Sequence, residues 1–329
     1  MTYPITEPDG RNPRLQAIDV LRGIAVLGMI AYHFSWDLWS NGLIEADVIG
    51  DPGWKAFART VAGTFVGLSG FNLILAHRNG FRRGLFLRRL AIIAGSAILV
   101  SVGTRLAMGE DFVYFGILHC IALSSVLALP FLRVPAWFLL LCGAGAIAAP
   151  FFLQNDVFDW PPLLFIGLSP HPRNTVDYVP LLPWFGVVLV GMALARLALD
   201  HGVTARLARW NPARAWRPLA FIGRWSLPIY LIHQPILIGL LSLALPMIGS
   251  GQDALAREFM RGCTQSGEAS AAKPGMCPAT CGCVATGARG AGLLEPAMKG
   301  TMTDEQSSSW DAIVSTCLPK APEASPGRT

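Results

Sequence analysis

Charged residues are scarce in this chain. Asp, Glu, Lys and Arg make up only 14% of its 329 residues, whereas 53% are hydrophobic. Soluble domains usually carry about 25% charged residues. A chain with so little charge cannot bury its apolar surface inside a water-soluble globule, so the composition predicts an integral membrane protein. Its Arg clusters flank apolar runs, which argues against nucleic-acid binding.

The sequence also lacks an internal repeat, a low-complexity run and a recognisable cleavage signal. No short apolar segment precedes a small-residue cleavage site, so we expect the first apolar run to be retained as a span. Paired CxxC knuckles and HxxxH or HxxE spacings, which are typical of zinc sites, are absent too. We therefore expect no metal centre.

Seven apolar runs are long enough to cross a bilayer, whose hydrocarbon core of about 30 Å needs about 20 helical residues. They are residues 18–39, 56–76, 89–108, 112–132, 136–153, 179–199 and 219–248. The last run contains Arg224 and Pro228, so we expect it to begin as an interfacial turn. The sequence thus predicts an all-α polytopic bundle of about seven spans, with a cytoplasmic segment (1–17), a transmembrane domain (18–248) and a tail (249–329).

Basic and acidic residues alternate between the two ends of these runs. The basic connections contain Arg11, Arg14, Arg78, Arg82, Arg83, Arg88, Arg89, Arg133, Arg206, Arg209, Arg214 and Arg217. The opposite connections contain Glu45, Asp47, Asp51, Glu110, Asp111, Asp156, Asp159 and Asp177. Arg and Lys mark cytoplasmic loops. We therefore expect a cytoplasmic N-terminus and, after an odd number of spans, a tail on the outer side.

The tail is rich in Gly, Ala, Ser and Pro and contains Cys263, Cys277, Cys281, Cys283 and Cys317. A short Cys-rich segment in an oxidising compartment indicates disulfide bonds. This interpretation agrees with the outer location that the charge pattern predicts. Five is an odd number, so one thiol is left over or pairs between chains.

The first run carries two polar pairs. Asp19 and Arg22 are three residues apart near its predicted cytoplasmic end, and His33 and Asp37 are four apart near its outer end. Both spacings place the partners on one helical face. One interpretation is structural: an ion pair that sets helix depth, and a histidine that hydrogen-bonds a neighbouring helix. The other is catalytic, because a carboxylate that orients an imidazole creates a general base.

Other polar residues fall inside or beside the apolar runs, where each needs a partner or a purpose. Trp184 stands in PLLPWFGVVLVGM, a segment whose prolines also suit an ordinary helix start. The remaining candidates for substrate binding are Asn72, His119, Tyr230, His233 and Gln234. Gly63, Gly67 and Gly70 have spacings that favour helix packing.

Four segments together resemble the heparan-alpha-glucosaminide N-acetyltransferase catalytic-domain family, in particular its bacterial members. They read IDVLRGIAVLGMIAYHFSWDL, YFGILHCIAL, VPLLPWFGVVLVGM and GRWSLPIYLIHQPIL. The wider transmembrane acyltransferase superfamily carries an Arg, ten residues and a His in its first helix, which Arg22 and His33 match. The resemblance implies that His33 is catalytic, that Arg22 serves the acyl donor, and that His119 and His233 occupy motif positions.

The same resemblance implies an integral-membrane O- or N-acyltransferase of the bacterial inner membrane. It would move an acetyl group from cytoplasmic acetyl-CoA to an acceptor on the far side. The chain is shorter than the lysosomal members, so a periplasmic glycan, a lipid-linked sugar or a peptidoglycan component is as good an expectation for the acceptor as a heparan-type glucosamine. Two alternatives remain: a proton-coupled transporter, since intramembrane His, Asp and Arg also build proton relays, and a scaffold that displays the tail.

Overall fold

Among the residues that the structure describes, five helices are long and apolar enough to cross a membrane. They are α1 (Gln16–Ser40), α2 (Pro52–His77), α3 (Arg83–Met108), α6 (Leu181–Asp200) and α9 (Ser226–Ile248). The computed structural model describes residues 15–41, 43–44, 46–171, 175, 177–248, 255–256, 258–260, 262–263 and 276–318. Every regular element in these residues is a helix. The chain is therefore an all-α, multi-pass membrane protein, as the composition predicts.

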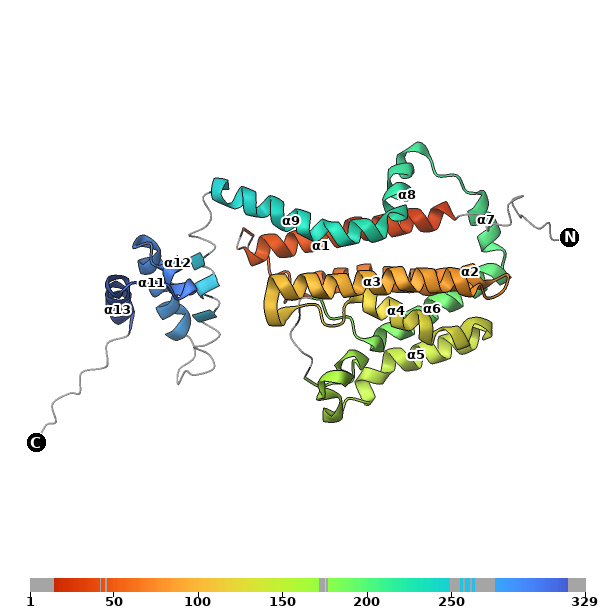
Figure 1. The fold of residues 1–329 in the computed structure, drawn as a ribbon, viewed down its shortest axis with the longest axis horizontal. Coiled ribbons are helices and arrows are strands. Elements are labelled where there is room, and N and C mark those ends of the chain that lie inside the picture. The colour runs from red at the N-terminus through yellow and green to blue at the C-terminus, as the bar shows by residue number, and fades with distance from the viewer. Residues whose placement is uncertain are drawn as a thin grey trace, which may run out of the picture. The chain divides into compact units, whose positions relative to one another are not determined.

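The chain forms two compact units. One, here the membrane unit, comprises residues 1–32 and 52–234, and the other, the tail unit, comprises residues 33–51 and 235–329. Within the membrane unit the long helices run roughly along one direction (Figure 1). The predicted boundary between transmembrane domain and tail, at residues 248 and 249, adjoins residues outside the described ranges, as do Arg11 and Arg14.

Two of the seven predicted spans form shorter apolar helices. The predicted span 112–132 contains α4 (Ile117–Leu127), which follows the 3-10 turn η1 (Gly109–Asp111) and precedes η2 (Leu129–Arg133). Eleven helical residues rise only about 16 Å, roughly half of the hydrocarbon core. Within this run, residues 112–116 are not helical and Pro130 stands in η2. The predicted span 136–153 forms α5 (Ala136–Phe152).

Helix α6 is the centre of the membrane unit and packs against both α2 and α5. Its contacts depend on glycine: a Cβ on Gly191 would lie 2.0 Å from the Gly67 carbonyl oxygen, and a Cβ on Gly70 would lie 2.1 Å from that of Val188. A Cβ on Gly186 would lie 2.6 Å from the Gly143 carbonyl oxygen. The prediction that Gly67 and Gly70 serve helix packing is confirmed.

Past α6 the chain continues through α7 (Val203–Arg209) and η5 (Arg214–Trp216) into α8 (Arg217–Arg224). The predicted last run therefore divides at Trp225 into α8 and α9, so its first residues form a separate short helix, and their interfacial placement stays a prediction. Helix α8 packs closely on α1, because a Cβ on Gly23 would lie 2.0 Å from the Leu219 carbonyl oxygen.

The tail unit contains the helices α11 (Met276–Gly290), α12 (Leu294–Lys299) and α13 (Asp304–Cys317). Disulfides join Cys263 to Cys281 and Cys283 to Cys317, so the prediction of disulfide bonds is confirmed. The side chain of Cys277 lies outside the described residues. A small apolar cluster completes the unit and includes Ala288, Leu293, Leu294, Phe259, Trp310 and Ile313.

Candidate functional site

The membrane unit encloses a cavity of about 200 Å³ that is bordered by five helices, α1, α2, α3, α4 and α9. Its polar lining consists of Arg22, Ser69, Asn72, Arg89, Ser226 and Tyr230. Its apolar lining consists of Phe65, Leu68, Ile93, Ile117, Leu118, Ile121 and Leu227. Three of the residues predicted to bind substrate, Arg22, Asn72 and Tyr230, thus meet on one cavity although 208 positions separate the first from the last along the chain.

Two guanidinium groups face this cavity. Arg22 Nη1 donates to Asp19 Oδ1 over 3.3 Å, in an ion pair whose carboxylate is buried. Arg89 belongs to α3, and its guanidinium is close enough to that of Arg22 for the two like charges to repel each other. Among the described residues, Arg89 makes no hydrogen bond or ion pair. Arg22 and Arg89 are the two charged residues among the described lining residues of this cavity, and both are cations, which favours a bound anion.

A second cavity of about 120 Å³ lies beside the first and shares Arg89 and Ile93 with it. Its other lining residues are Ala76, His77, Arg82, Leu85, Phe86, Leu90 and Ser125. His77 Nδ1 donates to the Leu73 carbonyl oxygen over 2.8 Å. Arg82 and Arg89 thus continue the positive lining toward the Arg-rich connection between α2 and α3.

The polar residues of α9 follow one another along a single helix. Tyr230 lines the first cavity, and His233 Nδ1 donates to the Tyr230 carbonyl oxygen over 2.7 Å. The His233 side chain is buried. In α2, the Asn72 carboxamide donates to the Leu68 carbonyl oxygen over 2.8 Å while lining the cavity. Gln234 follows His233 and is half-buried.

His119 has a protein partner on each ring nitrogen. Its Nδ1 accepts the Gly116 amide hydrogen over 3.3 Å, which closes the first turn of α4. In the neutral ring the other nitrogen, Nε2, therefore carries the proton and donates to Ser101 Oγ over 3.3 Å. Ser101 Oγ in turn donates to the Val113 carbonyl oxygen over 2.6 Å. These bonds give His119 a structural role, and its predicted part in substrate binding stays a prediction.

Asp177 also meets the start of α4. Its Oδ2 accepts the Ile117 amide hydrogen over 3.4 Å, although Asp177 precedes α6. Burial raises the pKa of the Asp177 carboxyl to about 6, and the Ile117 hydrogen bond opposes that rise. The negative charge of Asp177 interacts electrostatically with Tyr32 on α1 and with Tyr230 on α9.

The other predicted site residues lie elsewhere. Trp184 stands in the first turn of α6, packs against the core and covers Gly63 of α2. His33 and Asp37 lie one turn apart on α1, which is unbroken from Gln16 to Ser40, and both belong to the tail unit. Eleven residues of this helix, about three turns or roughly 16 Å, separate His33 from Arg22.

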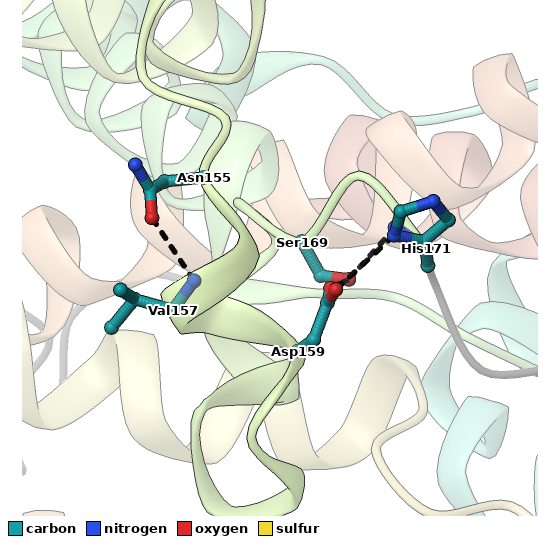
Figure 2. A network of polar contacts seen from close by, with 5 residues as sticks. All are labelled: Asn155, Val157, Asp159, Ser169 and His171. Atoms are coloured by element: carbon teal, nitrogen blue, oxygen red, sulfur yellow. Dashed lines mark hydrogen bonds and ion pairs between the residues drawn. The ribbon is translucent and has the colours of Figure 1, made fainter.

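A partly buried polar network organises the connection between α5 and α6 (Figure 2). In η3 (Asp156–Asp159), Asp159 accepts from Ser169 Oγ over 2.5 Å and from His171 Nδ1 over 3.1 Å, and these hydrogen bonds lower the pKa of Asp159. Asn155 Oδ1 accepts the Val157 amide hydrogen over 3.0 Å. The following 3-10 turn η4 (Pro161–Ile166) is tied to the bundle by Tyr114, which donates to the Pro161 carbonyl oxygen.

Sequence reasoning missed Arg89 and Asp177 as site residues and used both only as markers of topology. A signal was available for each. Arg89 is the first residue of a predicted span, and a cation at that depth calls for a partner. Asp177 stands three residues before Pro180, which precedes α6, and an acidic residue beside an apolar run also calls for a partner.

Comparison with protein families matches residues 14–235 to the family described as heparan-alpha-glucosaminide N-acetyltransferase, catalytic. The match spans more than half of the chain and includes both cavities, Asp177 and the helix that carries His33. No curated protein and no solved structure matches this chain.

Proposed function

Because the chain belongs to the heparan-alpha-glucosaminide N-acetyltransferase catalytic family, we propose that it transfers acetyl groups across the membrane. The family depends on acetyl-CoA as its acetyl donor. In this proposal the donor binds from the cytoplasm, and the acceptor is a sugar or glycan-type molecule at the outer face. The protein lies in a bacterial inner membrane with its N-terminus inside and its Cys-rich tail in the periplasm.

The positive cavity supports the donor side of this proposal and is the observation that carries it. Two guanidinium groups that share an apolar cavity repel each other strongly, because the low dielectric around them screens little. Acetyl-CoA carries a diphosphate and a phosphate, and Arg forms strong charge-assisted hydrogen bonds with such groups. Arg22, Arg82 and Arg89 provide cations along two adjoining cavities. The long pantetheine arm would then reach from these cations toward the outer half of the bundle.

His33 is the proposed catalytic residue, with Asp37 as its orienting partner. A carboxylate one turn away along the helix can fix the imidazole tautomer and stabilise its cation. His33 would then take a proton from the acceptor hydroxyl or amine, or accept the acetyl group transiently. In both routes the thioester C–S bond breaks, a C–O or C–N bond forms, and the CoA sulfur ends with the proton that the acceptor loses.

The direct test is acetyl transfer by the purified full chain in liposomes, with labelled acetyl-CoA and glucosamine as the probe acceptor. His33→Ala should lower the transfer rate about 10²- to 10⁴-fold, which is the usual contribution of a general base. Binding of acetyl-CoA should be retained. Ser35→Ala, two residues along the same helix, serves as the matched control and should behave as wild type.

Two results would overturn the proposal. Full transfer by His33→Ala would remove the catalytic role of that histidine. Proton-coupled solute flux in liposomes that contain no acetyl-CoA, without any transfer by the wild type, would instead establish a transporter.

A further inference from the structure

Asp177 is a largely buried carboxyl group that has no counter-charge among the described residues. The Ile117 amide is its one hydrogen-bond partner there, and that bond occupies a single carboxylate oxygen. Burying a charge without a paired cation costs free energy. Perturbed carboxyl groups of this kind concentrate at functional sites. Accepting the Ile117 amide hydrogen does not require a charged side chain. The carboxyl group at Asp177 therefore indicates a role beyond this structural contact.

The position of this carboxyl is built into the fold. A Cβ on Gly116 would lie 2.7 Å from Asp177 Oδ2, so the absence of a side chain at Gly116 allows the approach. Two residues later the Val179 amide donates to the Phe115 carbonyl oxygen over 3.0 Å. These contacts fasten the segment before α6 along the start of α4.

This place adjoins the Arg22–Arg89 cavity. Ile117, which holds the carboxylate, is itself a lining residue, and so is Tyr230, which feels the Asp177 charge. Tyr32 of α1 lies within electrostatic range as well. The chain reaches Asp177 from a connection that the charge pattern predicts to be outside. Ile117 and Tyr230 thus connect Asp177 to the cavity that Arg22 and Arg89 line.

We infer that Asp177 binds the acyl acceptor, by accepting hydrogen bonds from the hydroxyl or ammonium groups of an amino sugar or similar polyol. This inference rests on the proposed function and adds to it a residue and a chemical class for the acceptor side. Donor and acceptor would be recognised by opposite charges, cations for the phosphates of acetyl-CoA and a carboxylate for the sugar. The phosphates of acetyl-CoA are negatively charged, so a carboxylate at this position would not favour binding of the donor.

The test measures KM values for acetyl-CoA and for glucosamine with Asp177→Asn in liposomes. Asparagine keeps an oxygen for the Ile117 amide, so α4 retains its cap while the charge is lost. The KM for glucosamine should rise about tenfold or more, because hydrogen bonds to a charged group contribute about 1.5–3 kcal/mol. The KM for acetyl-CoA and the melting temperature should stay at wild-type values. Asp156→Asn, at an exposed acid of the same connection, is the matched control.

The outcomes separate this inference from the proposed function. Unchanged glucosamine KM in Asp177→Asn, with an active wild type, would overturn the role of Asp177 alone. Equal rises in both KM values would also overturn it, since they indicate a general distortion. If Asp177→Asn does not fold, Gly116→Ala displaces the same carboxylate, and the same split between the two KM values decides. No acetyl transfer by wild type would overturn the proposed function itself.

Discussion

Arg22 and Arg89 line the same cavity, although they come from different helices and carry the same charge. Asp19 pairs with Arg22, and in the described residues no carboxylate pairs with Arg89. A folded chain tolerates such a cation when a ligand supplies the missing negative charge. This relationship connects the fold to the donor that the family uses.

Arg89→Gln should weaken the binding of acetyl-CoA about tenfold or more, because it removes a charge-assisted contact to a phosphate. Calorimetric titration of the purified protein measures this affinity. Without ligand, the variant should melt no lower than wild type, since the lost guanidinium was repelled by Arg22. Arg88→Gln changes the exposed neighbour on the same helix and should leave the affinity unchanged. Equal affinities in the two variants would contradict a donor site at Arg89.

Acetyl transfer should depend on pH through Asp177, whose carboxyl has a pKa raised to about 6 by burial. The carboxylate is present above that pH and is lost as the pH falls through it, so the KM for glucosamine should rise below about pH 6. Among the described residues, the titratable groups that interact with the Asp177 charge are Tyr32, Cys120 and Tyr230. The amine of glucosamine titrates in the same way with either protein, so the difference between the wild-type and Asp177→Asn pH profiles reports the Asp177 carboxyl alone. Identical pH profiles of the glucosamine KM for the two proteins would contradict the assignment.

Gly191→Ala should destabilise the membrane unit by about 1–3 kcal/mol, because the added methyl group would meet the Gly67 carbonyl oxygen at 2.0 Å. Unfolding in mixed micelles with increasing denaturant measures the change. Gly95→Ala is the control on α3, where nothing lies within 4 Å of the added atom. That variant should be neutral or slightly more stable, since alanine favours the helix. A Gly191→Ala protein as stable as Gly95→Ala would refute the close packing of α2 and α6.

In a Cys277→Ser background, the four bridged tail cysteines should resist a membrane-impermeant maleimide reagent on intact cells until a reductant is added. Disulfides persist only in an oxidising compartment, so this result requires the tail to be outside the cytoplasm. Each bridge, with sequence separations of 18 and 34, should stabilise the tail unit by about 3–4 kcal/mol. In a Cys277→Ser background, the further change Cys263→Ser should expose the thiol of Cys281 to labelling. Labelling of the doubly bridged protein without reductant would contradict the pairing.

Much of the fold followed from the sequence because lipid imposes simple rules. Apolar length alone located α1, α2, α3, α6 and α9 with their ends correct to within seven residues. The run 112–132 was misjudged as a single span because hydropathy does not register the non-helical residues 112–116 or the 3-10 turn at Pro130. The disulfides were predicted from cysteine composition and compartment, but their pairing required the structure.

The candidate site was less accessible to sequence reasoning. The residues that matched a motif, such as Arg22 and Tyr230, were identified, and the structure places them on one cavity. Arg89 and Asp177 were not, because each resembles an ordinary loop charge until its neighbours across the bundle are known. His119 shows the converse: a histidine within an apolar run proved to close the first turn of α4.

Transfer across a sealed membrane tests the central claim most directly. Liposomes that contain the full chain, with its cytoplasmic face outward, are loaded with glucosamine and receive labelled acetyl-CoA outside. The account predicts labelled N-acetylglucosamine in the lumen with wild type and none above background with His33→Ala. Product that forms only when acetyl-CoA and glucosamine share one side, or equally with His33→Ala, would contradict it.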